Sequence, residues 1–157
     1  MPRCRSPSPE EIWRRTEPST AHPRQRLRAL KELVDAGIKV GVGMAPILPG
    51  LSDRPELLAD VVRAAREAGA TGVWSNLLFL RSGTREHFLD CLERDWPELL
   101  PRYEQLYAKG AYLPADAQKP LKQVVAELAR EHGIRDRRRN PLDGQELAEP
   151  EQLLLAV

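Results

Sequence analysis

Two strand-like segments, each following a helix that ends at a glycine, constrain the fold of this chain more than any other feature. Bulky residues alternate with small or polar ones from Ile38 to Ala45, which predicts a strand with one nearly bare face. The segment Thr71–Leu80 is almost continuously apolar, as is typical of a strand covered on both faces. Gly37 and Gly69 are the expected C-terminal stops of the two preceding helices.

Helical spacing of apolar residues accounts for most of the remaining chain. It predicts helices over residues 23–36, 53–68, 84–95 and 98–107, and an amphipathic helix within 113–133. Strands separated by a helix of this length are almost always parallel with a right-handed crossover, so we expect an α/β fold.

A pair of parallel strands leaves backbone groups unpaired at both edges, and three helices cannot cover both faces. We therefore expect this sequence to be part of a larger α/β domain whose remainder lies N-terminal. The expected organisation is a disordered head (1–10), an α/β unit (11–112), an amphipathic helix (113–133) and a tail (134–157).

Composition narrows the choice of partners and compartment. The net charge of +1 gives no strong electrostatic reason for nucleic acid or a membrane surface as the main partner. The sequence contains no apolar run long enough to span a membrane and no secretory signal. Two distant cysteines, Cys4 and Cys91, predict reduced thiols and a cytoplasmic location.

The segment from Gly41 to Asp53 is the first candidate for chemistry. Small residues at 41, 43 and 45 leave one strand face without bulky side chains, and the proline-pinned loop that follows lies where α/β folds bind ligands. The same pattern also suits tight helix–sheet packing, so both interpretations stay open. A dinucleotide-binding fingerprint is excluded because Pro46 stands where the third glycine belongs.

Other polar candidates carry weaker signals. Glu17 with Arg24 and Arg26 would either orient a polar ligand or form a solvated helix cap. Cys91 is expected to be a small core residue, and the basic cluster Arg135–Arg139 to be a solvated tail or a phosphate contact. Surface positions without shared metal-ligand spacing are expected for the three histidines His22, His87 and His132.

Several short motifs together resemble the radical S-adenosylmethionine superfamily, most closely the branch of spore photoproduct lyase. The most specific is Ala45-Pro46-Ile47-Leu48-Pro49-Gly50-Leu51-Ser52-Asp53. It is accompanied by Thr16-Glu17-Pro18, Arg26-Leu27, Ala36-Gly37-Ile38, Ala68-Gly69-Ala70 and Leu78-Phe79-Leu80-Arg81.

The resemblance implies the C-terminal part of a partial (β/α)6 TIM-like barrel, in which about two parallel strands with flanking helices belong to this chain. It also implies a family motif, G-x-I-x-G-x-x-E, that supports the adenine of S-adenosylmethionine. Pro46 replaces its first glycine, Leu48 its isoleucine and Asp53 its glutamate, whereas Gly50 is kept. The cofactor-binding residues that the resemblance implies are Ala45, Pro46, Ile47, Leu48, Pro49 and Gly50.

The sequence departs from the family at its [4Fe–4S] cluster, which three cysteines spaced C-x-x-x-C-x-x-C hold. No such triplet occurs here, and two distant thiolates cannot replace it. We therefore expect a radical-enzyme part that binds neither cluster nor cofactor alone and needs an N-terminal half as its partner. The alternatives are a non-catalytic interaction module and a nucleic-acid accessory protein that uses the arginine cluster.

Overall fold

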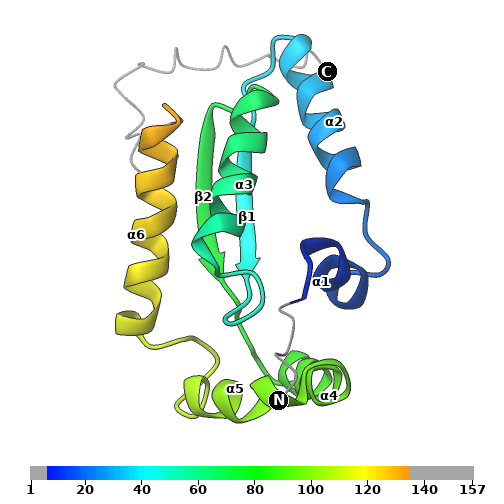
Figure 1. Ribbon diagram of the computed structural model, residues 1–157, viewed down its shortest axis with the longest axis vertical. Coiled ribbons are helices and arrows are strands. Elements are labelled where there is room, and N and C mark those ends of the chain that lie inside the picture. The colour runs from blue at the N-terminus through cyan, green and yellow to red at the C-terminus, as the bar shows by residue number, and fades with distance from the viewer. Residues whose placement is uncertain (1–6, 135–157) are drawn as a thin grey trace, which may run out of the picture.

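The computed structural model describes residues 7–134 and has an α/β fold (Figure 1). Residues 1–6 of the predicted head, with Cys4, and 135–157 of the predicted tail, with Arg135–Arg139, lie outside these residues. The last two residues of the predicted head, Pro9 and Glu10, are helical. The elements are α1 (Pro9–Thr16), α2 (Pro23–Asp35), β1 (Gly41–Ile47), α3 (Pro55–Glu67), β2 (Gly72–Leu77), α4 (Thr84–Asp95), the 3-10 turn η1 (Pro97–Leu99), α5 (Leu100–Leu106) and α6 (Ala115–Glu131).

Local sequence explains where the first helices begin and end. Ser8 caps α1 by accepting a hydrogen bond from the Glu11 N–H, and the His22 ring caps α2 from Nδ1. Pro55 opens α3 in the first turn, where its missing N–H costs nothing. Gly37 follows α2 with a φ of +81°, the left-handed conformation that ends many helices.

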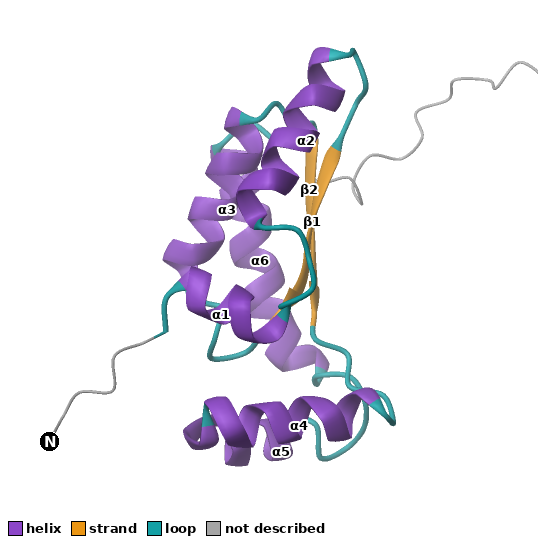
Figure 2. Ribbon diagram, turned by 90° about the vertical axis from the view of Figure 1, so that its right-hand side faces the viewer, coloured by secondary structure: helices purple, strands orange, loops and turns teal. Residues whose placement is uncertain are grey.

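The two strands form one parallel sheet whose register pairs Gly41 with Gly72 and Ile47 with Leu77. The register shifts between Met44 and Ile47, because Pro46 has no N–H to donate to the ladder. Figure 2 shows the sheet edge-on, with α1, α2, α3 and α6 on one side of it. We call the opposite side, to which Gly43 and Ala45 contribute, the helix-free face.

Two hydrophobic clusters stabilise the fold. The sheet cluster lies between the strands and their covering helices, and contains Met44, Ile47, Val62, Val73 and Val125 among others. The lower cluster lies at the carboxyl ends of the strands, where α4 and α5 cross beneath the sheet in Figure 1. Its buried residues are Ile12, Leu48, Leu51, Leu78, Leu80, Leu92, Trp96, Tyr103, Tyr107 and Leu113.

The expectation of a TIM-like barrel part is wrong for the described residues. They form an open two-stranded sheet with helices on one side, and α4, η1 and α5 lie across the strand ends instead of continuing the alternation of strands and helices. The second strand is also not covered on both faces. Its apolar run extends beyond Leu77 because Leu78 and Leu80 fill the lower cluster as irregular chain.

Within residues 7–134, none of the helices combines the length and apolar character needed to cross a membrane.

Candidate ligand-binding loop and pocket

The six sequence-predicted cofactor residues follow one another through the end of β1, but their side chains have different surroundings. Ala45 and Pro46 are exposed, and their peptide bond is cis. Ile47 belongs to the sheet cluster and Leu48 to the lower cluster. Pro49 is fully buried and Gly50 half-buried. Ala45 and Pro46 are therefore the residues of this set whose side chains are most accessible to a ligand.

Hydrogen bonds hold the loop after Pro46 in a fixed shape. The Leu48 N–H donates to Ser52 Oγ at 2.8 Å, and the Leu48 carbonyl accepts from the N–H groups of Leu51 and Ser52. The Ile47 carbonyl accepts from the Leu78 N–H at 3.1 Å, which ties the loop to the end of β2. Gly50 has a φ of +81°, a conformation that favours glycine.

The helix-free face is nearly bare along β1 but not along β2. A Cβ atom added to Gly43 would lie closest to Cζ2 of Trp74 and would be 2.8 and 2.9 Å from its Cε2 and Cη2, so the indole occupies the space above that glycine. Asn76 is exposed further along β2. The helix-free face therefore presents a half-buried indole beside the small residue Ala45. The space that the small residues of β1 leave open is partly occupied by Trp74 of the neighbouring strand.

A pocket of about 340 Å³ opens at the carboxyl end of β2. Its aromatic wall is Phe79 and Tyr112, whose ring centroids lie 4.3 Å apart at an interplanar angle of 33°. Lys122 of α6 also lines the pocket and has a positively charged ammonium group. The full lining is Asn76, Leu77, Leu78, Phe79, Tyr112, Leu113, Gln118 and Lys122.

Two buried tyrosines of the lower cluster differ in their hydrogen bonding. The Tyr107 hydroxyl donates to the Leu78 carbonyl at 2.7 Å, whereas the Tyr103 hydroxyl has no partner among the described residues. Burial raises the pKa of both hydroxyls well above the ordinary value for tyrosine. Both side chains are therefore neutral at physiological pH and have a structural role beneath the strand ends.

The predicted polar group of Glu17, Arg24 and Arg26 is only partly assembled. Arg26 donates to the Glu17 carboxylate, to Thr20 Oγ1 and to the Ala21 carbonyl. This exposed network joins α1 to α2 and corresponds to the solvated-cap interpretation. Arg24 takes no part in these hydrogen bonds and instead lines a groove beside α2.

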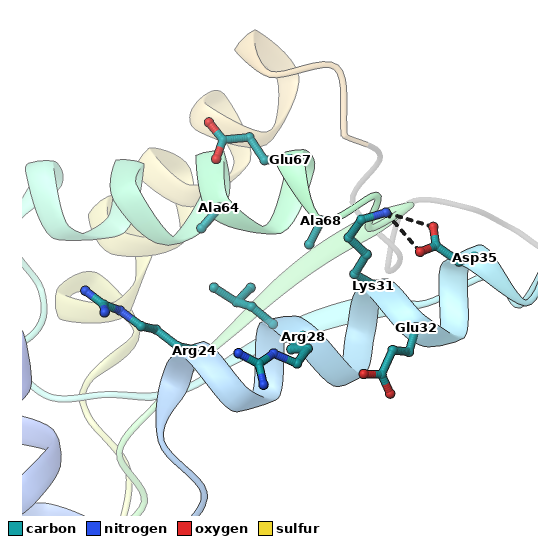
Figure 3. A pocket seen from close by; sticks show the side chains of 9 residues that line it. Arg24, Arg28, Lys31, Glu32, Asp35, Ala64, Glu67 and Ala68 are labelled. Carbon is teal, nitrogen blue, oxygen red and sulfur yellow. Dashed lines mark hydrogen bonds and ion pairs between the residues drawn. The ribbon is translucent and has the colours of Figure 1, made fainter.

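That groove lies between α2 and α3 and has a volume of about 510 Å³ (Figure 3). Charges of both signs line it, and Lys31 pairs with Asp35 at 2.8 Å on the same helix. Ala64 of α3 and Ala68, the residue that ends this helix, also line the groove and are labelled in Figure 3. Mixed, solvent-exposed charges and small residues indicate ordinary helix–helix packing.

The histidines are dispersed, and Cys91 is half-buried on α4. Cys91 Sγ lies 3.8 Å from His87 Nε2, while His22 and His132 stand at the ends of α2 and α6. Across residues 7–134, no three His, Cys, Asp or Glu side chains converge to hold a metal ion. This part of the chain therefore does not fit a [4Fe–4S] cluster, for which three convergent thiolates are required.

The pocket at the end of β2 was missed from the sequence. Phe79 and Tyr112 are 33 positions apart, and no local periodicity relates them. One sequence signal could have indicated each residue. Both are large aromatic residues at an expected strand end or loop, where no amphipathic helix would bury them. Only the fold brings the two rings and Lys122 together.

Comparison with known proteins places the chain beside three uncharacterized mycobacterial proteins, one from Mycobacterium bovis and two from strains of Mycobacterium tuberculosis. Each is 40% identical over 118 residues, which is 75% of this chain and 35% of the relative. The chain thus spans about a third of the length of these curated relatives. The sequence matches no protein-family profile, and no solved structure matches it.

Proposed function

We propose that this chain contributes the adenosyl-contacting segment of a radical S-adenosylmethionine enzyme related to spore photoproduct lyase. The observation that carries the proposal is the position of the Ala45–Asp53 motif. It begins at the carboxyl end of β1, and its first two residues are exposed. Ligands of α/β folds bind at this end of parallel strands.

The loop's construction suits a backbone contact to a planar base. Pro46 has no N–H and presents a rigid apolar ring, and Ala45 adds only a methyl group. The buried anchors Leu48 and Leu51 hold the segment in place from below. Such a segment would position the adenine without any charged side chain, in agreement with the apolar contact that the resemblance implies.

When bound, S-adenosylmethionine and a [4Fe–4S] cluster supply a 5′-deoxyadenosyl radical that abstracts hydrogen from a substrate. Because residues 7–134 do not fit the cluster, we assign them no step of that chemistry. We propose that the cluster belongs to polypeptide corresponding to the other two thirds of the mycobacterial relatives. That polypeptide would also cover the helix-free face and the outer edge of β1, and the assembled protein would be cytoplasmic.

The test is anaerobic reconstitution of the full chain with the unmatched part of a mycobacterial relative, in the presence of iron and sulfide. We expect S-adenosylmethionine to bind the mixture and to be converted to 5′-deoxyadenosine after reduction. Ala45→Leu places a bulky side chain on the proposed contact, and Ala29→Leu makes the same change at an exposed position of α2. Binding should fall at least tenfold in the first variant and remain unchanged in the second.

Two results would refute the assignment. One is S-adenosylmethionine binding that Ala45→Leu leaves intact. The other is a reconstituted mixture without any binding, together with cooperative unfolding of the chain alone, which would favour a non-catalytic interaction module.

A further inference from the structure

The lining of the pocket at the carboxyl end of β2 includes neither Ala45 nor Pro46, and the proposed function makes no use of it. Its aromatic wall is unusually open to solvent for residues of this size. Tyr112 is 68% exposed and Phe79 is 39% exposed. Large exposed rings that border a hollow with a few polar groups are characteristic of ligand sites.

The backbone behind this wall is held by hydrogen bonds from several directions. The Leu80 N–H donates to the Ala111 carbonyl at 2.8 Å, which fixes the Phe79 segment against the Tyr112 segment. The buried Tyr107 hydroxyl binds the Leu78 carbonyl, and Gln118 Nε2 donates to the Leu113 carbonyl, both at 2.7 Å. The two exposed rings therefore stand on a preorganised support, which lowers the entropic cost of binding.

The polar side of the pocket is built from α6. Lys122 is half-buried, and its Nζ donates to Gln118 Oε1 at 2.7 Å. None of the ion pairs formed within residues 7–134 includes Lys122, and it is the one cationic residue of the lining. A single cation balances a single negative charge, as on a carboxylate, better than the two charges of a phosphate monoester.

We propose that this pocket binds a small molecule in which a flat aromatic ring carries one carboxylate. The ring packs against the Phe79–Tyr112 wall, where aromatic groups gain energy beyond their buried area. The carboxylate accepts hydrogen bonds from Lys122. The volume of about 340 Å³ lies at the lower end of the range for small-molecule sites, which suits a ligand of one or two fused rings.

The probe is 2-naphthoate, measured against the full 157-residue chain by titration calorimetry and by ligand-observed NMR. Two analogues separate the contributions: 2-naphthamide keeps the ring without the charge, and cyclohexanecarboxylate keeps the charge without a flat ring. We expect 2-naphthoate to bind at one site per chain, and both analogues to bind about tenfold more weakly or not at all.

Matched variants locate the binding. Lys122→Gln should weaken 2-naphthoate binding about tenfold, whereas Lys119→Gln, on an exposed lysine of α6 outside the pocket, should not change it. Tyr112→Ala should weaken it about threefold or more, and Tyr112→Phe, which keeps the ring, should preserve it. Far-UV circular dichroism confirms that each variant is folded.

Three outcomes would overturn the inference. They are equal binding of the three compounds, 2-naphthoate binding that Lys122→Gln does not weaken, and tighter binding of a single-stranded DNA oligomer through Lys122 and Tyr112, which would assign the pocket to nucleic acid. Retained 2-naphthoate binding in Ala45→Leu would show that this pocket stands apart from the proposed adenosyl contact.

Discussion

Replacing Gly43 with alanine tests how the helix-free face is built. The added methyl group would lie closest to Trp74 Cζ2, and it would be 2.8 Å from Cε2 and 2.9 Å from Cη2, whereas carbon atoms pack best at about 3.5–4.0 Å. The indole must therefore move outward by more than about 1 Å or rotate into solvent. Either movement loses apolar contact between the ring and β1.

Two opposing effects set the magnitude. Inserting a methyl group into a packed contact costs about 1–3 kcal/mol. Alanine in a strand recovers about 0.5–1 kcal/mol of the backbone entropy that glycine loses on folding. We therefore expect Gly43→Ala to lower the free energy of unfolding, by up to about 2.5 kcal/mol, the difference between these two contributions.

A double-mutant cycle isolates the contact. With Trp74→Ala present, Gly43→Ala should no longer destabilise the chain and should raise its free energy of unfolding by about 0.5–1 kcal/mol. Urea unfolding, followed by the helical signal in circular dichroism, measures the free energy of unfolding of the original chain, the two single variants and the double variant. Equal destabilisation by Gly43→Ala in both backgrounds would show that the indole does not occupy the space above the glycine.

Three further predictions concern the core and its ends. Tyr107→Phe should lower the free energy of unfolding by about 1–3 kcal/mol because it leaves the buried Leu78 carbonyl without its donor, whereas Tyr103→Phe should be neutral or stabilising; equal urea midpoints for the two variants would contradict this. Burial raises the pKa of both hydroxyls, so the folded state holds their protons more tightly, and the contribution of the two tyrosines to stability should be fully present below about pH 10 and be lost as the pH rises above it. Urea titrations on either side of that pH measure this loss, and Tyr103→Phe should reduce it. Gly69→Ala should cost more than Gly37→Ala in thermal unfolding, because both have positive φ but only the first would bring Cβ to 2.8 Å from a valine methyl; the reverse order would refute the reasoning.

Local patterns predicted the elements whose signals are local. The helix over 84–95 has the expected bounds, and the helix from Pro23 ends within one residue of its prediction. The parallel pairing follows from the intervening helix, and it is present. In contrast, the barrel prediction required further strands to pair with the outer edges of β1 and β2. The periodicity of one segment does not indicate whether such neighbouring strands are present.

The predicted site was only partly recoverable for a related reason. Apolar residues in the motif indicate burial in the core or contact with a ligand equally well. In the structure, Ile47, Leu48 and Pro49 are buried in the protein core. The apolar run ending at Leu80 was predicted to be strand for the same reason. Its last residues are apolar because Leu78 and Leu80 are buried in the lower cluster, and the strand ends before them. Phe79 and Tyr112 meet only because the chain returns beneath the sheet before α6 begins.

Adjacent residues of one peptide, Ile47 and Leu48, anchor two different hydrophobic clusters. Such a connection allows sub-global opening, in which α4 and α5 detach while the β1–β2 ladder stays intact. Amide hydrogens of the lower helices would then exchange sooner than those of the strands. The Pro46–Asp53 segment would lose its packing contacts each time these helices detach. A molecule that binds this segment would therefore also slow the amide hydrogen exchange of α4 and α5, which it does not contact.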